Sequence, residues 1–191
     1  MPDASAELDA RRILKILTES DVHFILIGGQ AATAQGSTTV TYDIDIVYSR
    51  ERQNLKRLAD VLRGLGATLR GADPGLPFRL DAETLERGLN FTFATRLGSL
   101  DCLGEASGDF TYERLAANAD RYEIAGVTVA VASLDDLIRM KRAAGRIKDR
   151  IEVENLSALR DVRERKSPSR RVRVGGKAKV RGAQRRPLRR R

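Results

Sequence analysis

A short apolar run that ends in two glycines, followed at a fixed distance by two alternating carboxylates, constrains this chain more than any other feature. Residues 22–27 (VHFILI) are rich in β-formers and end at Gly28-Gly29, and Asp43 and Asp45 follow after a spacer of 13 residues. The apolar run predicts a buried strand. The alternation of acid and aliphatic residues predicts a second strand with both carboxylates on one face.

These residue types at this spacing suit phosphate and metal chemistry. Two glycines at a strand-to-helix turn let backbone N–H groups approach a triphosphate without an intervening Cβ, and the dipole of the following helix favours anions. Carboxylates two residues apart on a strand are roughly 6–7 Å apart along the backbone and can share Mg²⁺ ions that bridge to nucleotide phosphates. The pattern predicts nucleotide binding at Gly28 and Gly29 and metal binding at Asp43 and Asp45. A plain turn and a solvated strand face would also fit either half alone.

The remaining pattern predicts an α/β (α+β) fold. Amphipathic or helix-compatible segments alternate with short apolar runs, and turn signals such as Ala125-Gly126 predict hairpins, which favour a mixed sheet flanked by helices. In the last expected helix we place Ile151, Leu156 and Leu159 on the inward face. The expected helices are 6–19, 30–35, 50–65, 82–87, 112–119, a helix from Ser133 to a break at Gly145, and 148–163; the expected strands after residue 48 are 90–95, 99–103, 122–124 and 127–130.

The order apolar residue, Gly-Gly, spacer and Asp-x-Asp resembles the signature of the polymerase β-like nucleotidyltransferases. That resemblance implies a third metal-binding carboxylate on a later strand, and Asp101, in the apolar context Leu-Asp-Cys-Leu, is placed to serve. Many members carry Arg four residues before the first Asp, where this chain has Thr39, whereas Thr41 matches a frequent Thr.

A second resemblance lies in residues 131–149, which look like the helical region of the AbiEii/MenT-like nucleotidyltransferases, a group that includes toxins of toxin–antitoxin pairs. It implies that Lys141 holds nucleotide phosphate and acts in catalysis, and that Asp149 is the following catalytic acid. A solvated surface lysine and an acid favoured by a helix N-terminus are the structural alternatives for these two residues.

The charge of the chain is concentrated at its C-terminal end. Of 35 Lys and Arg, 11 lie in residues 167–191, which contain no acid, leaving 24 against 26 acids in residues 1–166. Such an Arg-rich segment with few apolar side chains predicts a disordered tail, either an electrostatic arm for nucleic acid or a solubilising appendage. We therefore expect a nucleotidyltransferase domain over 1–164, with a catalytic core at about 22–132 and C-terminal helices at about 133–164, and the tail over 165–191.

Composition limits the other possibilities. One cysteine (Cys102) and one histidine (His23) exclude an internal disulfide and argue against a zinc site, and both residues are expected to be structural. No apolar run approaches the length of a membrane span, so a cytoplasmic protein without membrane contact is expected.

The combined expectation is a Mg²⁺-dependent enzyme that moves an NMP from an NTP to an acceptor. The resemblance suggests RNA, such as the 3′ end of tRNA, as the acceptor and an antitoxin as partner. The alternatives are a catalytically inactive fold that binds nucleic acid or a protein through its basic tail, and transfer to a small molecule as in antibiotic-modifying relatives.

Overall fold

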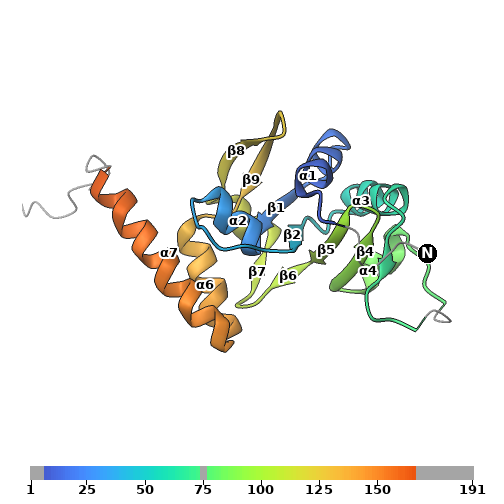
Figure 1. The fold of residues 1–191 in the computed structure, drawn as a ribbon. Helices are drawn as coiled ribbons and strands as arrows, with labels where there is room; N and C mark the ends of the chain where they lie inside the picture. Colours follow the sequence, from blue (N-terminus) through green and yellow to red (C-terminus); the bar gives the residue numbers. More distant parts are fainter. Residues whose placement is uncertain (1–6, 74–76, 167–191) are drawn as a thin grey trace, which may run out of the picture.

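The fold is built on one large sheet (Figure 1). The computed structural model describes residues 7–73 and 77–166. Seven strands form the sheet in the order β3-β4-β5-β2-β1-β9-β8, and β6 and β7 pair separately. The strands are β1 (Phe24–Ile27), β2 (Asp43–Tyr48), β3 (Thr68–Leu69), β4 (Asn90–Thr95), β5 (Gly98–Leu103), β6 (Glu105–Ala106), β7 (Phe110–Thr111), β8 (Asp120–Ile124) and β9 (Val127–Val131).

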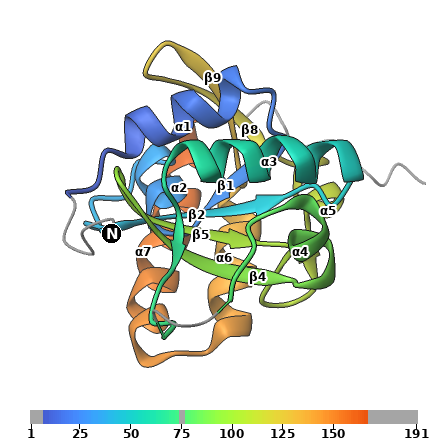
Figure 2. The ribbon, with the colours of Figure 1, turned by 90° about the vertical axis from the view of Figure 1, so that its right-hand side faces the viewer.

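The large sheet is mixed, as the hairpin signals predicted. β2 runs parallel to β5 and β1 parallel to β9, whereas the other neighbours are antiparallel. Helices cover both faces, so the predicted α/β class is confirmed. Figure 2 shows α1 and α3 over one face and α6 and α7 on the opposite side. The helices are α1 (Ala10–Glu19), α2 (Gly28–Ala34), α3 (Arg52–Gly64), α4 (Ala82–Arg87), α5 (Tyr112–Ala116), α6 (Leu134–Ala144) and α7 (Ile147–Lys166).

The two central strands explain how the chain combines a dry core with a polar face. All four residues of β1 are buried, because the strand is central in the sheet and covered on both sides. On β2, Ile44 and Ile46 are fully buried, while Asp43 and Asp45 between them keep partial solvent access. The period-2 pattern of β2 therefore separates an aliphatic face, directed into the core, from an acidic face.

Several details differ from the sequence expectations. The first helix begins at Ala10, where the Asp9 side chain caps it, and α5 ends at Ala116 instead of residue 119. The prediction that Ile151 faces inward is wrong: it is 65% exposed. Val153 packs against the core instead, together with the predicted Leu156 and Leu159, because α7 lies against the core along only part of its length.

Two expectations stay predictions. The disordered basic tail falls on residues outside the described part of the chain, apart from the last residues of α7. The expected boundary between residues 164 and 165 likewise stays a prediction. Within the described ranges, no helix combines the length and the apolar character needed to cross a membrane.

A buried glutamine ties the C-terminal helix to the sheet. Gln35 is fully buried, and its Nε2 donates to the Ala132 carbonyl and to Asp120 Oδ2, both at 2.9 Å. Its Oε1 accepts from Tyr122 Oη at 2.8 Å and from Arg163 Nη1 of α7 at 2.6 Å. Every polar atom of this amide is therefore paired, which is what a fully buried amide requires.

We expect Gln35→Ala to lower the free energy of unfolding by about 2 kcal/mol, because the change leaves buried partners unpaired and opens a small cavity. Urea denaturation measures the loss. Arg165→Ala is the matched control, because within residues 7–73 and 77–166 Arg165 donates to a single group, a carbonyl of its own helix. Equal stability of the two variants would contradict the role given to Gln35.

Candidate active site

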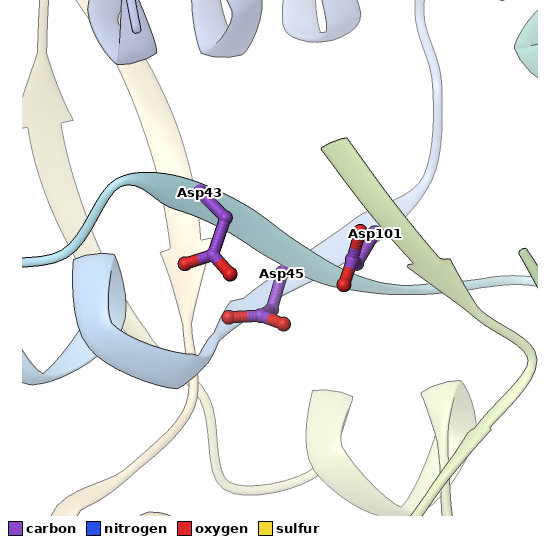
Figure 3. A group of neighbouring side chains, drawn as sticks. All are labelled: Asp43, Asp45 and Asp101. Atoms are coloured by element: carbon purple, nitrogen blue, oxygen red, sulfur yellow. The ribbon is translucent and has the colours of Figure 1, made fainter. Parts of the chain in front are cut away.

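Three carboxylates meet on one face of the parallel strands β2 and β5 (Figure 3). Asp43 and Asp45 lie on β2, and the register of the parallel pair sets Asp101 of β5 directly beside Asp45. One oxygen from each of the three lies within 4.8 Å of the others. The structure thus brings together the three residues that the sequence pattern and the resemblance proposed as metal ligands.

The glycine turn packs directly against this cluster. Gly28 has a φ of +64°, and a Cβ at this position would lie 1.9 Å from Asp45 Oδ2. A Cβ at Gly29 would lie 2.5 Å from the Thr41 Cβ. Both glycines are needed for steric reasons, since a Cβ at Gly28 would overlap Asp45 and a Cβ at Gly29 would overlap Thr41.

Burial, reinforced by nearby negative charge, changes the ionisation of the central acid. Burial, with the neighbouring charges of Asp43 and Asp101, raises the pKa of Asp45 to about 6. Asp43 accepts a hydrogen bond from Thr41 Oγ1 at 2.7 Å. This contact gives the predicted Thr match a local role, because it orients the outer carboxylate of β2.

An arginine that sequence reasoning missed contacts the third acid. Arg70 Nη2 donates to Asp101 Oδ1 at 2.7 Å and to Oδ2 at 2.9 Å. Burial raises the pKa of Asp101, and the Arg70 charge opposes that rise. The contact joins residues 31 positions apart, so no local sequence signal could have indicated it.

A second charged group, at the junction of α6 and α7, lines a cavity that it shares with Asp45. Lys141 lines a cavity of about 120 Å³ together with Asp45, Gly28 and Arg146. The Lys141 side chain is only 15% exposed and forms ion pairs with Asp149, at 3.5 Å, and with Glu152. The predicted Lys141 is therefore placed beside the acid cluster rather than on the solvated surface of the helix.

Asp149 is placed behind the cavity rather than in its lining. It is 1% exposed and accepts from Arg146 Nε at 2.8 Å and from the Arg146 backbone N–H at 3.2 Å. Burial opposes its ionisation, but the Arg146 hydrogen bond and the Lys141 charge outweigh burial and lower the pKa of Asp149. A buried, ionised Asp149 fixes two cations that do line the cavity.

The donor set at the acid cluster suits a hard divalent cation. Asp43, Asp45 and Asp101 supply only carboxylate oxygens, which are the ligands Mg²⁺ prefers. A divalent cation would also offset the negative charges of Asp43 and Asp101, which add to the effect of burial on the pKa of Asp45. The cluster fits Mg²⁺ in ligand chemistry and in charge.

The fold of the chain also occurs in other proteins of known structure. No family model and no curated protein sequence matches the chain. The structure is similar to that of the lincosamide antibiotic adenylyltransferase LnuA with lincomycin bound, with a TM-score of 0.54 at 13% identity over 80% of this chain and 99% of that one. The chain has the nucleotidyltransferase fold.

Two further solved structures are less similar to the chain. The antibiotic-resistance factor ANT(2″)-Ia gives a TM-score of 0.47 at 20% identity, over 82% of this chain and 90% of that one. An antigenic nucleotidyltransferase-like protein from Paracoccidioides brasiliensis gives 0.48 at 14% identity, over 85% of this chain and 79% of that one.

Within the nucleotidyltransferase fold, three charged residues of the site were absent from the sequence prediction. Arg146 directly precedes α7, and Glu152 lies on α7 one helical turn beyond Asp149. Helical spacing from Asp149 could have suggested Glu152. Arg70 could be found only from the register of the sheet.

Proposed function

We propose that this chain is a Mg²⁺-dependent nucleotidyltransferase that transfers an NMP from an NTP to an acceptor hydroxyl, with release of pyrophosphate. The observation that carries the proposal is the cluster of Asp43, Asp45 and Asp101 packed against the Gly28-Gly29 turn. Three acids gathered at one point cost stability unless a cation or a ligand compensates them, so their presence favours a function.

The roles follow from position. Asp43, Asp45 and Asp101 would hold Mg²⁺, which when bound neutralises phosphate charge and favours ionisation of the attacking hydroxyl. The backbone at Gly28 and Gly29 gives the triphosphate close access to the acids. Lys141 supplies positive charge at the leaving phosphates from across the cavity, and Asp149 acts on the reaction by holding Lys141 and Arg146 in place.

For the acceptor we propose RNA, such as the 3′ end of tRNA. The 11 basic residues of the segment 167–191 support this choice, because they would attract a polyanion. A toxin role with an antitoxin partner rests on the AbiEii/MenT-like pattern of residues 131–149. Transfer to a small hydroxylated molecule is the second candidate, favoured by the similarity to LnuA, whose structure contains lincomycin.

Label transfer tests the activity and names the acceptor. The protein is incubated with Mg²⁺ and each NTP labelled at the α-phosphate, together with total RNA or with a panel of hydroxylated antibiotics. We expect label in RNA and equimolar pyrophosphate, and none with Asp43→Ala/Asp45→Ala. NTP labelled at the γ-phosphate is the control that separates nucleotidyl transfer from kinase activity. Label in a small molecule alone would replace the acceptor. No label in any fraction, with no NTP binding by calorimetry, would contradict the enzyme proposal. Binding through the basic segment 167–191 would then be the remaining candidate function.

Replacement of the cavity lysine tests the phosphate role. We expect Lys141→Gln to lower kcat/KM for the NTP by about a hundredfold. The reason is the loss of a preorganised positive charge near the phosphates, where negative charge develops during the reaction. Lys15→Gln on α1 is the matched control, since in the described part of the chain Lys15 pairs with the exposed Glu19 and with no other acid. Initial rates with saturating acceptor measure the effect, and a Lys141→Gln rate within twofold of the control would contradict the role.

A further inference from the structure

The arginine that contacts Asp101 is placed there by the register of the sheet. Residues Leu69 and Phe93 pair between β3 and β4, so Arg70 is next in register to Thr92, whose carbonyl accepts the Arg70 N–H at 2.9 Å. Thr92 in turn pairs with Asp101. Residues in one register row project from the same face of a sheet, so Arg70 and Asp101 share a face.

This row continues into the acid cluster, because Asp101 pairs with Asp45 on β2. Neighbouring strands are about 4.8 Å apart, so the backbones of Arg70 and Asp101, two strands apart, are separated by about 10 Å. The two side chains together are long enough to span this distance. Thr92 between them is short and exposed, so the guanidinium passes over it. The contact with Asp101 is thus built into the pairing of three strands.

The Arg70 guanidinium donates hydrogen bonds to the same Asp101 oxygens that would coordinate a metal ion. A single nitrogen, Nη2, lies 2.7 Å and 2.9 Å from the two Asp101 oxygens. The Arg70 side chain is 39% exposed, against 16% for Asp101. The backbone of Arg70 is fixed by its bond to Thr92, but its long side chain can rotate away into solvent without any change in the sheet.

We propose that Arg70 is an electrostatic latch on Asp101: its guanidinium competes with the divalent cation for the third carboxylate, and the cation must displace it. The inference rests on the proposed metal centre. Free cation then binds weakly, whereas a cation that arrives with a triphosphate brings further ligands and charge and can displace the arginine. Arg70 would make full use of Asp101 conditional on nucleotide.

Binding of Mn²⁺ in the absence of nucleotide tests the latch independently of catalysis. We expect Arg70→Gln to lower the Kd for Mn²⁺ by about fivefold, the upper end of what a partly exposed ion pair contributes. The electron paramagnetic resonance signal of free Mn²⁺ measures the Kd. Arg87→Gln removes the same charge from the exposed Glu83 pair on α4 and should leave the Kd unchanged. Arg70→Lys keeps the charge on a shorter, more strongly hydrated side chain, so its Kd for Mn²⁺ should fall between those of the unaltered protein and Arg70→Gln.

A double-mutant cycle assigns the effect to the proposed contact. In an Asp101→Asn background, Arg70→Gln should change the Kd by less than twofold. Tightening that persists in that background, or an Arg70→Gln Kd equal to that of the unaltered protein, would overturn the latch alone. Absence of Mn²⁺ uptake by both the unaltered protein and Arg70→Gln would overturn the proposed metal centre and the latch with it. Thermal unfolding of each variant verifies that it is folded.

Discussion

Replacing Asp45 by Asn is expected to abolish nucleotidyl transfer and, without added metal, to make the protein more stable. Loss of a central metal ligand should lower the transfer rate at least about a thousandfold. The stability gain follows from the pKa of Asp45, which burial and the charges of Asp43 and Asp101 raise from 3.8 to about 6. The ionised carboxylate is penalised in the folded protein, and Asn removes the charge with little change of shape.

The pH dependence has a definite sign. Because the folded-state pKa is higher than the unfolded one, protonated Asp45 contributes stability that is fully present below pH 3.8 and is lost as pH rises through about 6. Above that range the ionised acid should cost about 1–3 kcal/mol, an amount shared with the neighbouring acids. Asp45→Asn should therefore flatten the fall in stability of the unaltered protein between these pH values.

Urea denaturation in EDTA at several pH values measures the gain. Asp60→Asn is the matched control, because Asp60 is an exposed acid on α3 that pairs with Arg63. Added Mg²⁺ should stabilise the unaltered protein and not Asp45→Asn. A less stable Asp45→Asn protein above pH 6 would show that the acids at this point are compensated within the chain.

Replacing Gly28 by Ala is expected to damage both stability and the metal centre. Alanine at a φ of +64° costs about 1–2 kcal/mol by itself. The new Cβ would also lie 1.9 Å from Asp45 Oδ2 and 2.7 Å from its Cγ, so the acid cannot escape by rotation of its end alone. We expect a total loss of about 2–4 kcal/mol in the free energy of unfolding, together with loss of Mg²⁺ stabilisation as Asp45 is displaced.

A second glycine separates the two causes. Gly126, in the turn between β8 and β9, has a φ of +79°, and a Cβ there would meet nothing within 4 Å. Gly126→Ala should show only the cost of the backbone conformation and keep its response to Mg²⁺. If Gly28→Ala and Gly126→Ala lose equal stability and both respond to Mg²⁺, the close packing of the glycine turn on Asp45 would be refuted.

The local parts of this fold were readable from the sequence, because they depend on neighbours along the chain. The period of β2 gave an acidic face at Asp43 and Asp45 and an aliphatic face at Ile44 and Ile46, and the structure has both. Apolar stripes and turn residues similarly located the helices and hairpins to within a few residues. The mixed sheet followed from those hairpins.

Tertiary structure alone decided which distant groups meet. The sequence could offer Asp101 as a third acid only through a resemblance, whereas the parallel pairing of β2 and β5 sets it beside Asp45. The contact of Arg70 with Asp101 and that of Lys141 with Glu152 depend on strand register and on the packing of α6 against α7. Ile151 shows the reverse case, because periodicity assigns a face to a helix but not how far the core extends along it. Register and packing are set by the sum of many weak non-local contacts, which no segment of the sequence specifies by itself.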